Sequence, residues 1–166
     1  MFKIIAFFTF AFLIAGCGFK PLYGDRTASS VTDELAKIKV LTIKDRLGQK
    51  LHNLLLDRLS PKGRPTHPLY TLSVQAVVNK QELGLKFTEV TTRAKLTLQT
   101  NFNLDDAATG VTLLKGTARS VNSYNIVDSD FATLSAESNA TDRAIREVSD
   151  AIKIRLSLFL ASNRGT

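Results

Sequence analysis

Few residues in this 166-residue chain are suited to covalent or acid–base chemistry, because it holds one Cys and two His. The thiol of Cys17 is a potential nucleophile through its thiolate form. A lone Cys excludes an internal disulfide framework and a CxxC metal or redox pair. The two histidines, His52 and His67, leave little material for a zinc site. The sequence therefore offers one reactive thiol and few groups for a catalytic centre.

Serine hydrolase chemistry would need a histidine beside an activated serine. His52 falls beside the leucine face of an expected helix, and His67 lies between prolines in an expected loop. The chain lacks a GxSxG elbow, a GxxxxGK[ST] phosphate loop and a GxGxxG dinucleotide motif. The adjacent acids Asp105 and Asp106 fall in an expected turn that lacks the spacing of a metal loop. We predict a non-enzymatic protein without a metal or a cofactor.

The first 16 residues, MFKIIAFFTFAFLIAG, have the order of a secretion signal: one cation, an apolar run and then small residues. As a helix, the apolar run from Ile4 to Ile14 reaches about 16 Å, too short for a hydrocarbon core of about 30 Å. The alternative is a buried N-terminal helix. Five of the ten Phe lie here without a polar face, which favours a cleaved signal peptide over residues 1–16.

The sequence LIAGC at residues 13–17 resembles the lipobox of bacterial lipoproteins. In that motif the thiolate of the Cys takes a diacylglyceryl group, the preceding peptide is removed and the new N-terminus is acylated. The alternative is a free thiol in an oxidising compartment, which is a liability. Multiple acyl chains give a stable anchor, and Gly rather than Asp at position 18 implies outer-membrane sorting. We expect lipid on Cys17 at the periplasmic side of the outer membrane.

The mature chain divides by composition and periodicity. Residues 17–34 contain Gly, Pro, Ser and Thr without a helical or strand period, which predicts a lipidated N-terminus and a tether. Residues 35–162 are expected to form one α+β domain, and residues 163–166 a frayed C-terminus. Period-two alternation predicts four strands, and spacing of three and four predicts two helices. The strands cover residues 35–43, 69–79, 90–104 and 111–127, and the helices cover 45–59 and the chain from 130.

The order β-α-β-β-β-α predicts a two-layer sandwich, in which a four-stranded, mostly antiparallel sheet carries two helices on one face. Asp45 is the expected N-cap of the first helix, and Gly48 is expected to mark close packing. The C-terminal segment is either one long helix or two, with a break near residues 141–144. The second face of the sheet is polar and is left for solvent or a partner.

The formal charge of +7 points to an anionic partner. Eight cations and two acids lie between Ala36 and Arg64. The polar sheet face is expected to present Arg93, Lys95, Lys115 and Arg119, and cross-strand neighbours at about 5 Å could form one patch. An exported protein does not meet cytoplasmic nucleic acid, so lipopolysaccharide phosphates are the expected anions. The alternative is a solvated charged face without a ligand.

Residues 17–24, CGFKPLYG, resemble the start of mature lipopolysaccharide-assembly lipoproteins of the LptE type, in the branch typical of alphaproteobacteria. Two further stretches are similar to that family. They are TTRA at 91–94, leading into a strand and an Asp turn, and SYN at 123–125, followed by a helix that contains DRA at 142–144. The enterobacterial branch has Leu-Arg-Gly after Cys-Gly-Phe, which this chain lacks, so no position is transferred from that branch.

The resemblance implies a non-enzymatic plug inside the outer-membrane β-barrel LptD, which helps that barrel assemble and insert lipopolysaccharide into the outer leaflet. Cys17 is then the anchor, and the four sheet-face cations are expected to contact lipid phosphates or the barrel wall. One alternative is an envelope lipoprotein that scaffolds or activates a cell-wall synthase. Another is a lipid-anchored hydrolase, in which joint replacement of His52 and His67 would abolish function.

Overall fold

The structure, a computed structural model, describes residues 26–83 and 92–163. Contacts divide the chain into two compact units, Met1–Ser30 and Val31–Thr166. The predicted signal peptide, Cys17 and the CGFKPLYG motif lie outside the described residues. All described residues therefore belong to the second unit or to the helix that leads into it.

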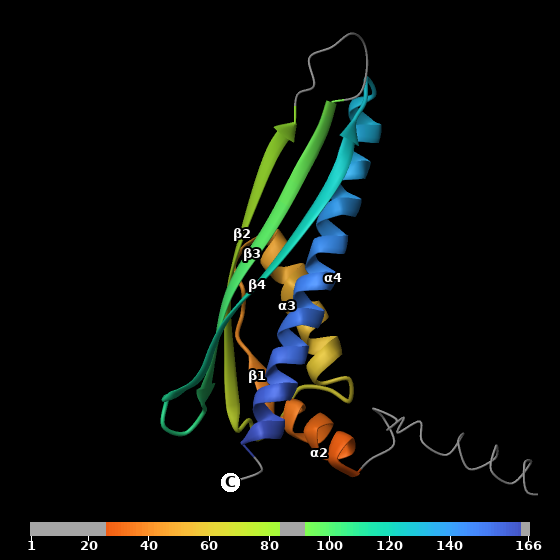
Figure 1. The fold of residues 1–166 in the computed structure, drawn as a ribbon. Helices are drawn as coiled ribbons and strands as arrows, with labels where there is room; N and C mark the ends of the chain where they lie inside the picture. Colours follow the sequence, from red (N-terminus) through yellow and green to blue (C-terminus); the bar gives the residue numbers. More distant parts are fainter. Residues whose placement is uncertain (1–25, 84–91, 164–166) are drawn as a thin grey trace, which may run out of the picture. The chain divides into compact units, whose positions relative to one another are not determined.

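The second unit is built on a four-stranded sheet with the order β1-β2-β3-β4. β1 runs parallel to β2, whereas the β2–β3 and β3–β4 pairs are antiparallel (Figure 1). This mixed sheet with helices confirms the predicted α+β class and the β-α-β-β-β-α layout. The elements in chain order are α2 (Arg26–Leu35), β1 (Ile38–Val40), α3 (Asp45–Leu59), β2 (Tyr70–Leu83), β3 (Thr92–Asp106), β4 (Thr112–Ile126) and α4 (Asp130–Ser162).

The core lies between the sheet and the helices α3 and α4. Leucines spaced by four along α3 are fully buried, as the helical period predicts. Each such side chain contributes about 1.5–3 kcal/mol relative to exposure, so this layer supplies much of the stability. The fully buried large side chains include Leu51, Leu55 and Leu59 of α3, Ile152 and Leu156 of α4, and Leu72, Leu96, Leu98 and Phe102 of the strands.

The helix α2 was not predicted, since nine of its ten residues fall within the stretch 17–34 that was expected to be a tether. Only residues 17–25 of that stretch lie outside the described residues, and residues 26–35 are helical. Val31 and Leu35 lie one turn apart, and both pack against the core. Because most other residues of α2 are polar, the spacing of four between Val31 and Leu35 was not recognised as a helical period. The helix continues into a turn through bonds from Ala36 N to Thr32 O and Lys37 N to Glu34 O, both 3.0 Å, so the strand predicted at 35–43 is wrong in length.

β1 comprises three residues, which pair with Tyr70–Leu72 of β2. Ile38 and Val40 are buried and Lys39 is exposed, so the predicted alternation is confirmed over this short range. Leu41 adds one further backbone bond to Leu72, and the chain then leaves the sheet towards α3. The described strands therefore pair with the outer side of β2 only at its beginning.

α3 has the predicted bounds, but its start differs from the expectation. The N-cap position is occupied by Lys44, and Asp45 is the first helical residue, with φ of 74°. Gly48 confirms the expected close packing, because a Cβ at this position would lie 2.6 Å from Cγ2 of Ile43. α4 is one continuous helix of 33 residues, capped by the Ser129 hydroxyl, which accepts from Ala132 N.

The turn predicted at DDAATG, residues 105–110, connects β3 to β4, and Asp106 stabilises it. β3 itself extends through Asp106, so the turn begins later than expected. The Asp106 carboxylate accepts bonds from the backbone N–H groups of Ala108 and Thr109 and from the Thr109 hydroxyl. These bonds, those from Thr109 first, lower the pKa of Asp106. Gly110 completes the turn with φ of 72°, a conformation that glycine adopts without strain.

Candidate functional site

The face of the sheet opposite the helices, here called the polar face, carries exposed or half-buried side chains along three long strands. Successive side chains of a strand point to opposite faces, so the buried alternation on the helix side fixes this set. The members are mostly amides, hydroxyls and cations, with two valines. They are Ser73, Gln75, Val77, Asn79 and Gln81 of β2; Arg93, Lys95, Thr97, Gln99, Asn101 and Asn103 of β3; and Lys115, Thr117, Arg119, Val121, Ser123 and Asn125 of β4.

The four predicted cations lie on this face, but the strand register spreads them out. Arg119 of β4 is opposite Gln99 of β3, four residues along the strand from Lys95. At about 3.4 Å per residue, that separation is about 14 Å. Lys115 lies a further four residues along β4, and Arg93 lies beyond Lys95. The expectation of close cross-strand neighbours is therefore wrong, because none of the four faces another. They form a row along the face.

Two of these cations nonetheless line one open hollow. Lys95 and Arg119 border a depression of about 470 Å³ at the centre of the polar face. Side-chain amides surround them and offer both donors and acceptors. The remaining lining residues are Val77, Asn79, Gln81, Thr97, Gln99 and Asn101. This arrangement suits hydrogen bonding to a polar, anionic surface.

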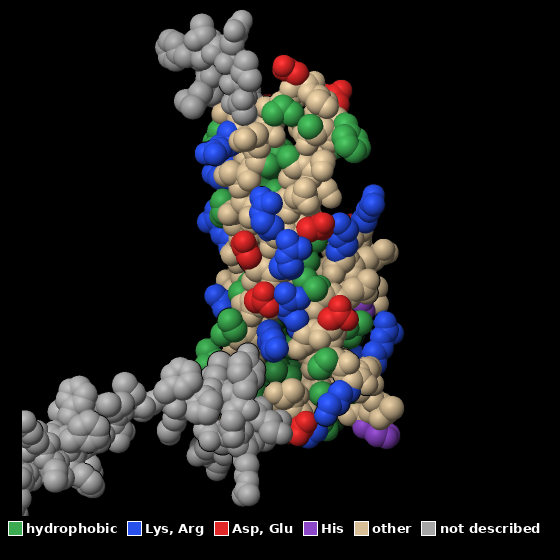
Figure 2. Space-filling view, turned by 90° about the vertical axis from the view of Figure 1, so that its right-hand side faces the viewer, with side chains coloured by type: hydrophobic (Ala, Val, Ile, Leu, Met, Phe, Trp, Pro, Cys, Tyr) green, Lys and Arg blue, Asp and Glu red, His purple; other side chains and the backbone are tan. Residues whose placement is uncertain are grey.

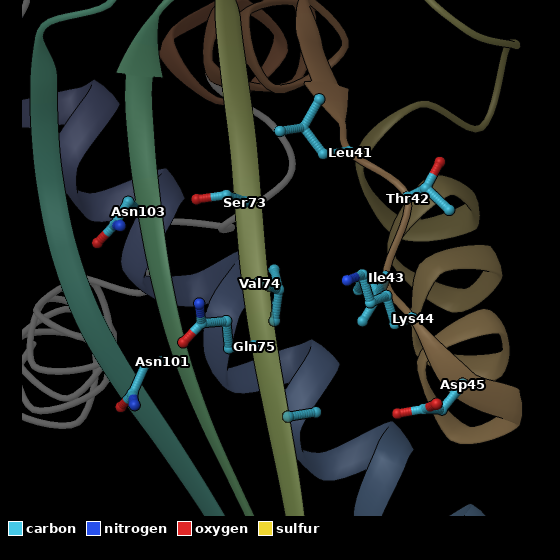
Figure 3. Close-up of a pocket in the computed structure, with 11 residues that line it drawn as sticks. Leu41, Thr42, Ile43, Lys44, Asp45, Ser73, Val74, Gln75, Asn101 and Asn103 are labelled. Atoms are coloured by element: carbon cyan, nitrogen blue, oxygen red, sulfur yellow. The ribbon is translucent and has the colours of Figure 1, made fainter.

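A second hollow adjoins the first at Asn101 and lies beside β2 (Figure 3). Its walls are β2 and the segment Leu41–Asp45, which connects β1 to α3. Val74 faces Ile43 across the gap, while Asn101 and Asn103 belong to the polar face of β3 (Figure 3). The hollow therefore connects apolar side chains to the amide-lined polar face. The periodicity of the sequence did not predict this hollow.

Three of the eight cations between Ala36 and Arg64 form ion pairs among the described residues, and two of these pairs join the helices. Lys50 donates to Asp142 at 2.7 Å, and Arg58 pairs in two bonds with Asp150, so both pairs join α3 to α4. The Arg58 hydrogen bond lowers the pKa of Asp150. Lys37 pairs locally with Glu34 at 2.7 Å. Figure 2 shows Lys and Arg interleaved with Asp and Glu along this helix side of the molecule.

A polar network joins the first half of α4 to β4. The carboxylate of Glu147 accepts from the Ser120 hydroxyl at 2.5 Å and from the Asn122 amide at 3.3 Å. Arg143 donates to the Asn122 side chain at 3.1 Å and to the Ser123 carbonyl at 3.3 Å. Ser120 and Asn122 lie on the helix side of the sheet and are buried, although both side chains are polar. The network therefore adds polar contacts to the apolar packing of this part of the interface, where Ala144, Val148 and Leu98 are fully buried.

The same interface contains a tyrosine–carboxylate contact near the β2–β3 hairpin. The Tyr124 hydroxyl donates to Glu137 at 3.2 Å, and Lys80 of β2 forms an ion pair with the same carboxylate. Burial, followed by the negative charge of Glu137, raises the pKa of Tyr124. This group reaches from β2 and β4 to α4, which is a connection that no local sequence pattern indicates.

The histidines do not form a visible catalytic arrangement. His52 is half-buried, and its Nδ1 lies 3.0 Å from the Leu41 carbonyl, while His67 is exposed in the loop after α3. The described residues include no group of three or more His, Cys, Asp or Glu side chains placed to hold a metal ion. None of the helices in the described part of the chain is both long and apolar enough to cross a membrane.

The fold defines a small α+β protein in which one side of a long-stranded sheet is polar and open. A protein described as a lipoprotein from Caulobacter crescentus has the same fold, with a TM-score of 0.67 and 25% identity over 80% of this chain and 97% of that one. A minor lipoprotein from Acinetobacter baumannii shares the fold, with a TM-score of 0.58 and 21% identity over 78% and 96%. A search of the curated proteins finds no significant match.

The LptE family of lipopolysaccharide-assembly proteins matches residues 30–156, and the chain belongs to that family. This confirms the resemblance found in the sequence. The family consists of non-enzymatic, outer-membrane-associated lipoproteins, which places the chain in lipopolysaccharide assembly.

Proposed function

We propose that this chain is a lipid-anchored plug of an LptD-type outer-membrane β-barrel, where it helps the barrel assemble and helps insert lipopolysaccharide into the outer leaflet. The observation that carries the proposal is the family match over residues 30–156. In this role the protein binds and positions its partners, makes and breaks no bond, and needs no cofactor beyond the lipid on Cys17.

The polar face supports this role in physical terms. A barrel lumen presents polar side chains, and an amide-rich sheet face can pair with them through many hydrogen bonds. Lys95 and Arg119 at the central hollow could also take phosphate groups through charge-assisted bonds. Arg93 and Lys115 extend the cationic row along the same face. We therefore assign contacts with lipopolysaccharide or the barrel wall to this row.

The anchor is part of the proposal. Lipid on Cys17 would hold the domain at the periplasmic side of the outer membrane, and mass spectrometry of the N-terminal peptide tests it. We expect an acylated Cys17 as the first residue. An unmodified Cys17 with residues 1–16 still attached would contradict the anchor.

Crosslinking in cells tests the partner. We expect the full chain to capture a large outer-membrane β-barrel, identified by mass spectrometry. Charge reversal of the central pair, Lys95→Glu with Arg119→Glu, should reduce that capture, whereas Arg146→Glu on the exposed side of α4 is the matched control. Capture of a cell-wall synthase without a barrel would favour the scaffold alternative.

Depletion tests the role in assembly. Loss of the chain should leave lipopolysaccharide in the periplasm and lower the amount of mature barrel. If neither quantity changes, the plug function is wrong. Joint replacement of His52 and His67 should leave both quantities near the wild-type level, since the proposed function requires no catalysis.

A further inference from the structure

A third hollow, here called the loop pocket, lies away from the polar-face row, between β1, α3 and the loop that follows α3. Its volume is about 470 Å³. Its walls come from three separate parts of the chain, so it is a product of the tertiary fold. The lining residues are Lys39, Val40, Leu41 and Thr42 from β1 and its continuation; His52 and Leu56 from α3; and Arg64, Pro65, Thr66 and Pro68 from the loop.

The charge of the loop pocket is one-sided. Its titratable and charged lining residues are Lys39 from β1, His52 from α3 and Arg64 from the loop, and the lining includes no Asp or Glu. Lys39 and Arg64 are exposed, and neither takes part in the ion pairs found among the described residues. This contrasts with Lys50 and Arg58, whose charges are met by carboxylates of α4. The pocket therefore gathers cations whose charge remains uncompensated.

The orientation of His52 adds a directed group. Its Nδ1 lies 3.0 Å from the Leu41 carbonyl, which can only accept, so Nδ1 carries the hydrogen. The other ring nitrogen, Nε2, is left for a ligand. A ring nitrogen in this position can form a hydrogen bond with a ligand in the pocket.

The frame of the loop pocket is stiff. Three of the four prolines lie between residues 61 and 68, and proline restricts the backbone. The loop is also closed by a bond from Gly63 N to Ser60 O at 2.9 Å. A preformed frame lowers the ordering cost of binding a small ligand.

We propose that the loop pocket binds a phosphate group, held by the charges of Lys39 and Arg64, with the His52 ring in the wall of the site. The hydroxyls of Thr42 and Thr66 in the lining can donate to the remaining oxygens. The group is either free phosphate or the phosphate of a lipid headgroup. This site is separate from the polar face and does not depend on the plug function.

The first test titrates the full chain, purified in nonionic detergent, with sulfate at constant pH. Binding is followed by NMR signals of the His52 ring and the Arg64 guanidinium. We expect saturable shifts, and binding that weakens as sodium chloride is added, because charged side chains hold the anion. The variant Arg64→Gln should weaken binding about tenfold through loss of a charge-assisted bond.

Two further variants separate the site from general charge effects. Lys62→Gln removes an exposed cation of the same loop that does not line the pocket, and we expect less than about a twofold change. His52→Asn keeps a donor for the Leu41 carbonyl but removes Nε2, and we expect it to weaken binding less than Arg64→Gln does. Equal losses in Arg64→Gln and Lys62→Gln, or wild-type shifts that never saturate, would overturn the proposal.

The source of the phosphate is decided by competition. Inorganic phosphate and phosphatidylcholine vesicles containing phosphatidic acid are each added to the sulfate complex, with pure phosphatidylcholine vesicles as the control. Displacement by inorganic phosphate assigns a free anion, and displacement by the phosphatidic acid vesicles alone assigns a lipid headgroup. Failure of both to displace sulfate would overturn the assignment of a phosphate site. Charge reversal at Arg119 should leave all these results unchanged, so failure here is distinguishable from failure of the plug function.

Discussion

The two ends of the interface between α4 and the sheet differ in how many polar contacts accompany their apolar packing. In the basal half, formed by α3, β1 and the last part of α4, buried leucines and isoleucines meet the apolar strands. In the distal half, towards the β2–β3 hairpin, Glu147, Arg143 and Glu137 of α4 bond to polar side chains of β2 and β4. Apolar packing is strong but undirected, whereas hydrogen bonds are weaker in net terms and specify position.

This difference predicts a gradient of stability along one continuous helix. The basal half should open only with global unfolding, while the distal half should open locally at a lower free energy. A binding protein that must fit a partner gains from such a gradient, because the softer end can adjust while the core remains folded. Substitutions in both halves test this difference, from the largest expected effect to the smallest.

The largest effect is expected in the basal core. Leu156→Ala removes a side chain that is 0% exposed and should lower the free energy of unfolding by about 2–5 kcal/mol. Leu158→Ala, at 66% exposure on the same helix, is the matched control and should change it by less than about 0.5 kcal/mol. Urea denaturation measures both. Equal effects would show that the basal half is not a packed core.

A contact across β3 and β4 comes next. A Cβ at Gly116 would overlap the ring of Phe102, which is itself fully buried. Gly116→Ala should therefore cost about 1–3 kcal/mol through overpacking. Adding Phe102→Leu should recover part of that loss, so the double variant will be less destabilised than the sum of the two singles. Strict additivity in denaturant titrations would contradict the contact.

The distal network should give a local effect. Glu147→Ala leaves the buried Ser120 and Asn122 without their shared acceptor, at a cost of about 1–3 kcal/mol. Hydrogen exchange should quicken at the amides around Ser120 to Tyr124 and stay unchanged around Leu55. The neighbouring exposed variant Arg146→Ala should leave both regions unaffected. Uniform acceleration throughout the chain would remove the distinction between the halves.

Acid should weaken the pair between α3 and α4. The pKa of Asp150 is lowered by Arg58, so its stabilisation is present above the unfolded value of about 3.9 and is lost as the pH falls through the folded value. Because Asp150 is 56% exposed, solvent screening limits the effect to at most about 1 kcal/mol. Asp150→Asn should flatten the fall in unfolding free energy between about pH 5 and 3. Asp57→Asn, an exposed carboxylate of α3, should leave it steep.

Alkali should weaken the distal half instead. The pKa of Tyr124 is raised by burial and by Glu137, so its contribution is complete below about pH 10 and is lost as the pH rises through the folded value. Tyr124→Phe should reduce the loss of stability above about pH 10. Thermal unfolding at each pH measures this loss. An alkaline loss of the same size in both proteins would contradict the role of this contact.

Strands and helices with a clean period were predictable from sequence. The inward residues of β2 and β3 and both ends of α3 follow from periods of two and 3.6, because burial of one face imposes them. α2 was missed because its two core contacts, Val31 and Leu35, are set among polar residues. β1 was predicted too long, because the alternation of apolar and polar residues over 35–43 extends beyond the paired residues. Leu35 belongs to α2, and β1 itself is only Ile38–Val40.

The site was less predictable than the fold. The sheet-face cations could be assigned to one face of the sheet. Their spacing, however, depends on the register between β3 and β4, which the period of the side chains does not determine. The pairs Lys50–Asp142 and Arg58–Asp150 join residues 92 positions apart, and no local pattern carries such information. For the same reason the loop pocket, assembled from three segments, leaves no sequence motif.

The brevity of β1 has a consequence for the solubility of the protein. Within the described residues, no strand pairs with the outer side of β2 beyond Leu72, so a row of backbone groups is open to pairing with other chains. Such rows promote aggregation unless charged or polar side chains discourage it. β2 carries Lys80 and Glu82 towards its end and amides before them. These side chains disfavour edge-to-edge pairing of β2 between copies of the chain.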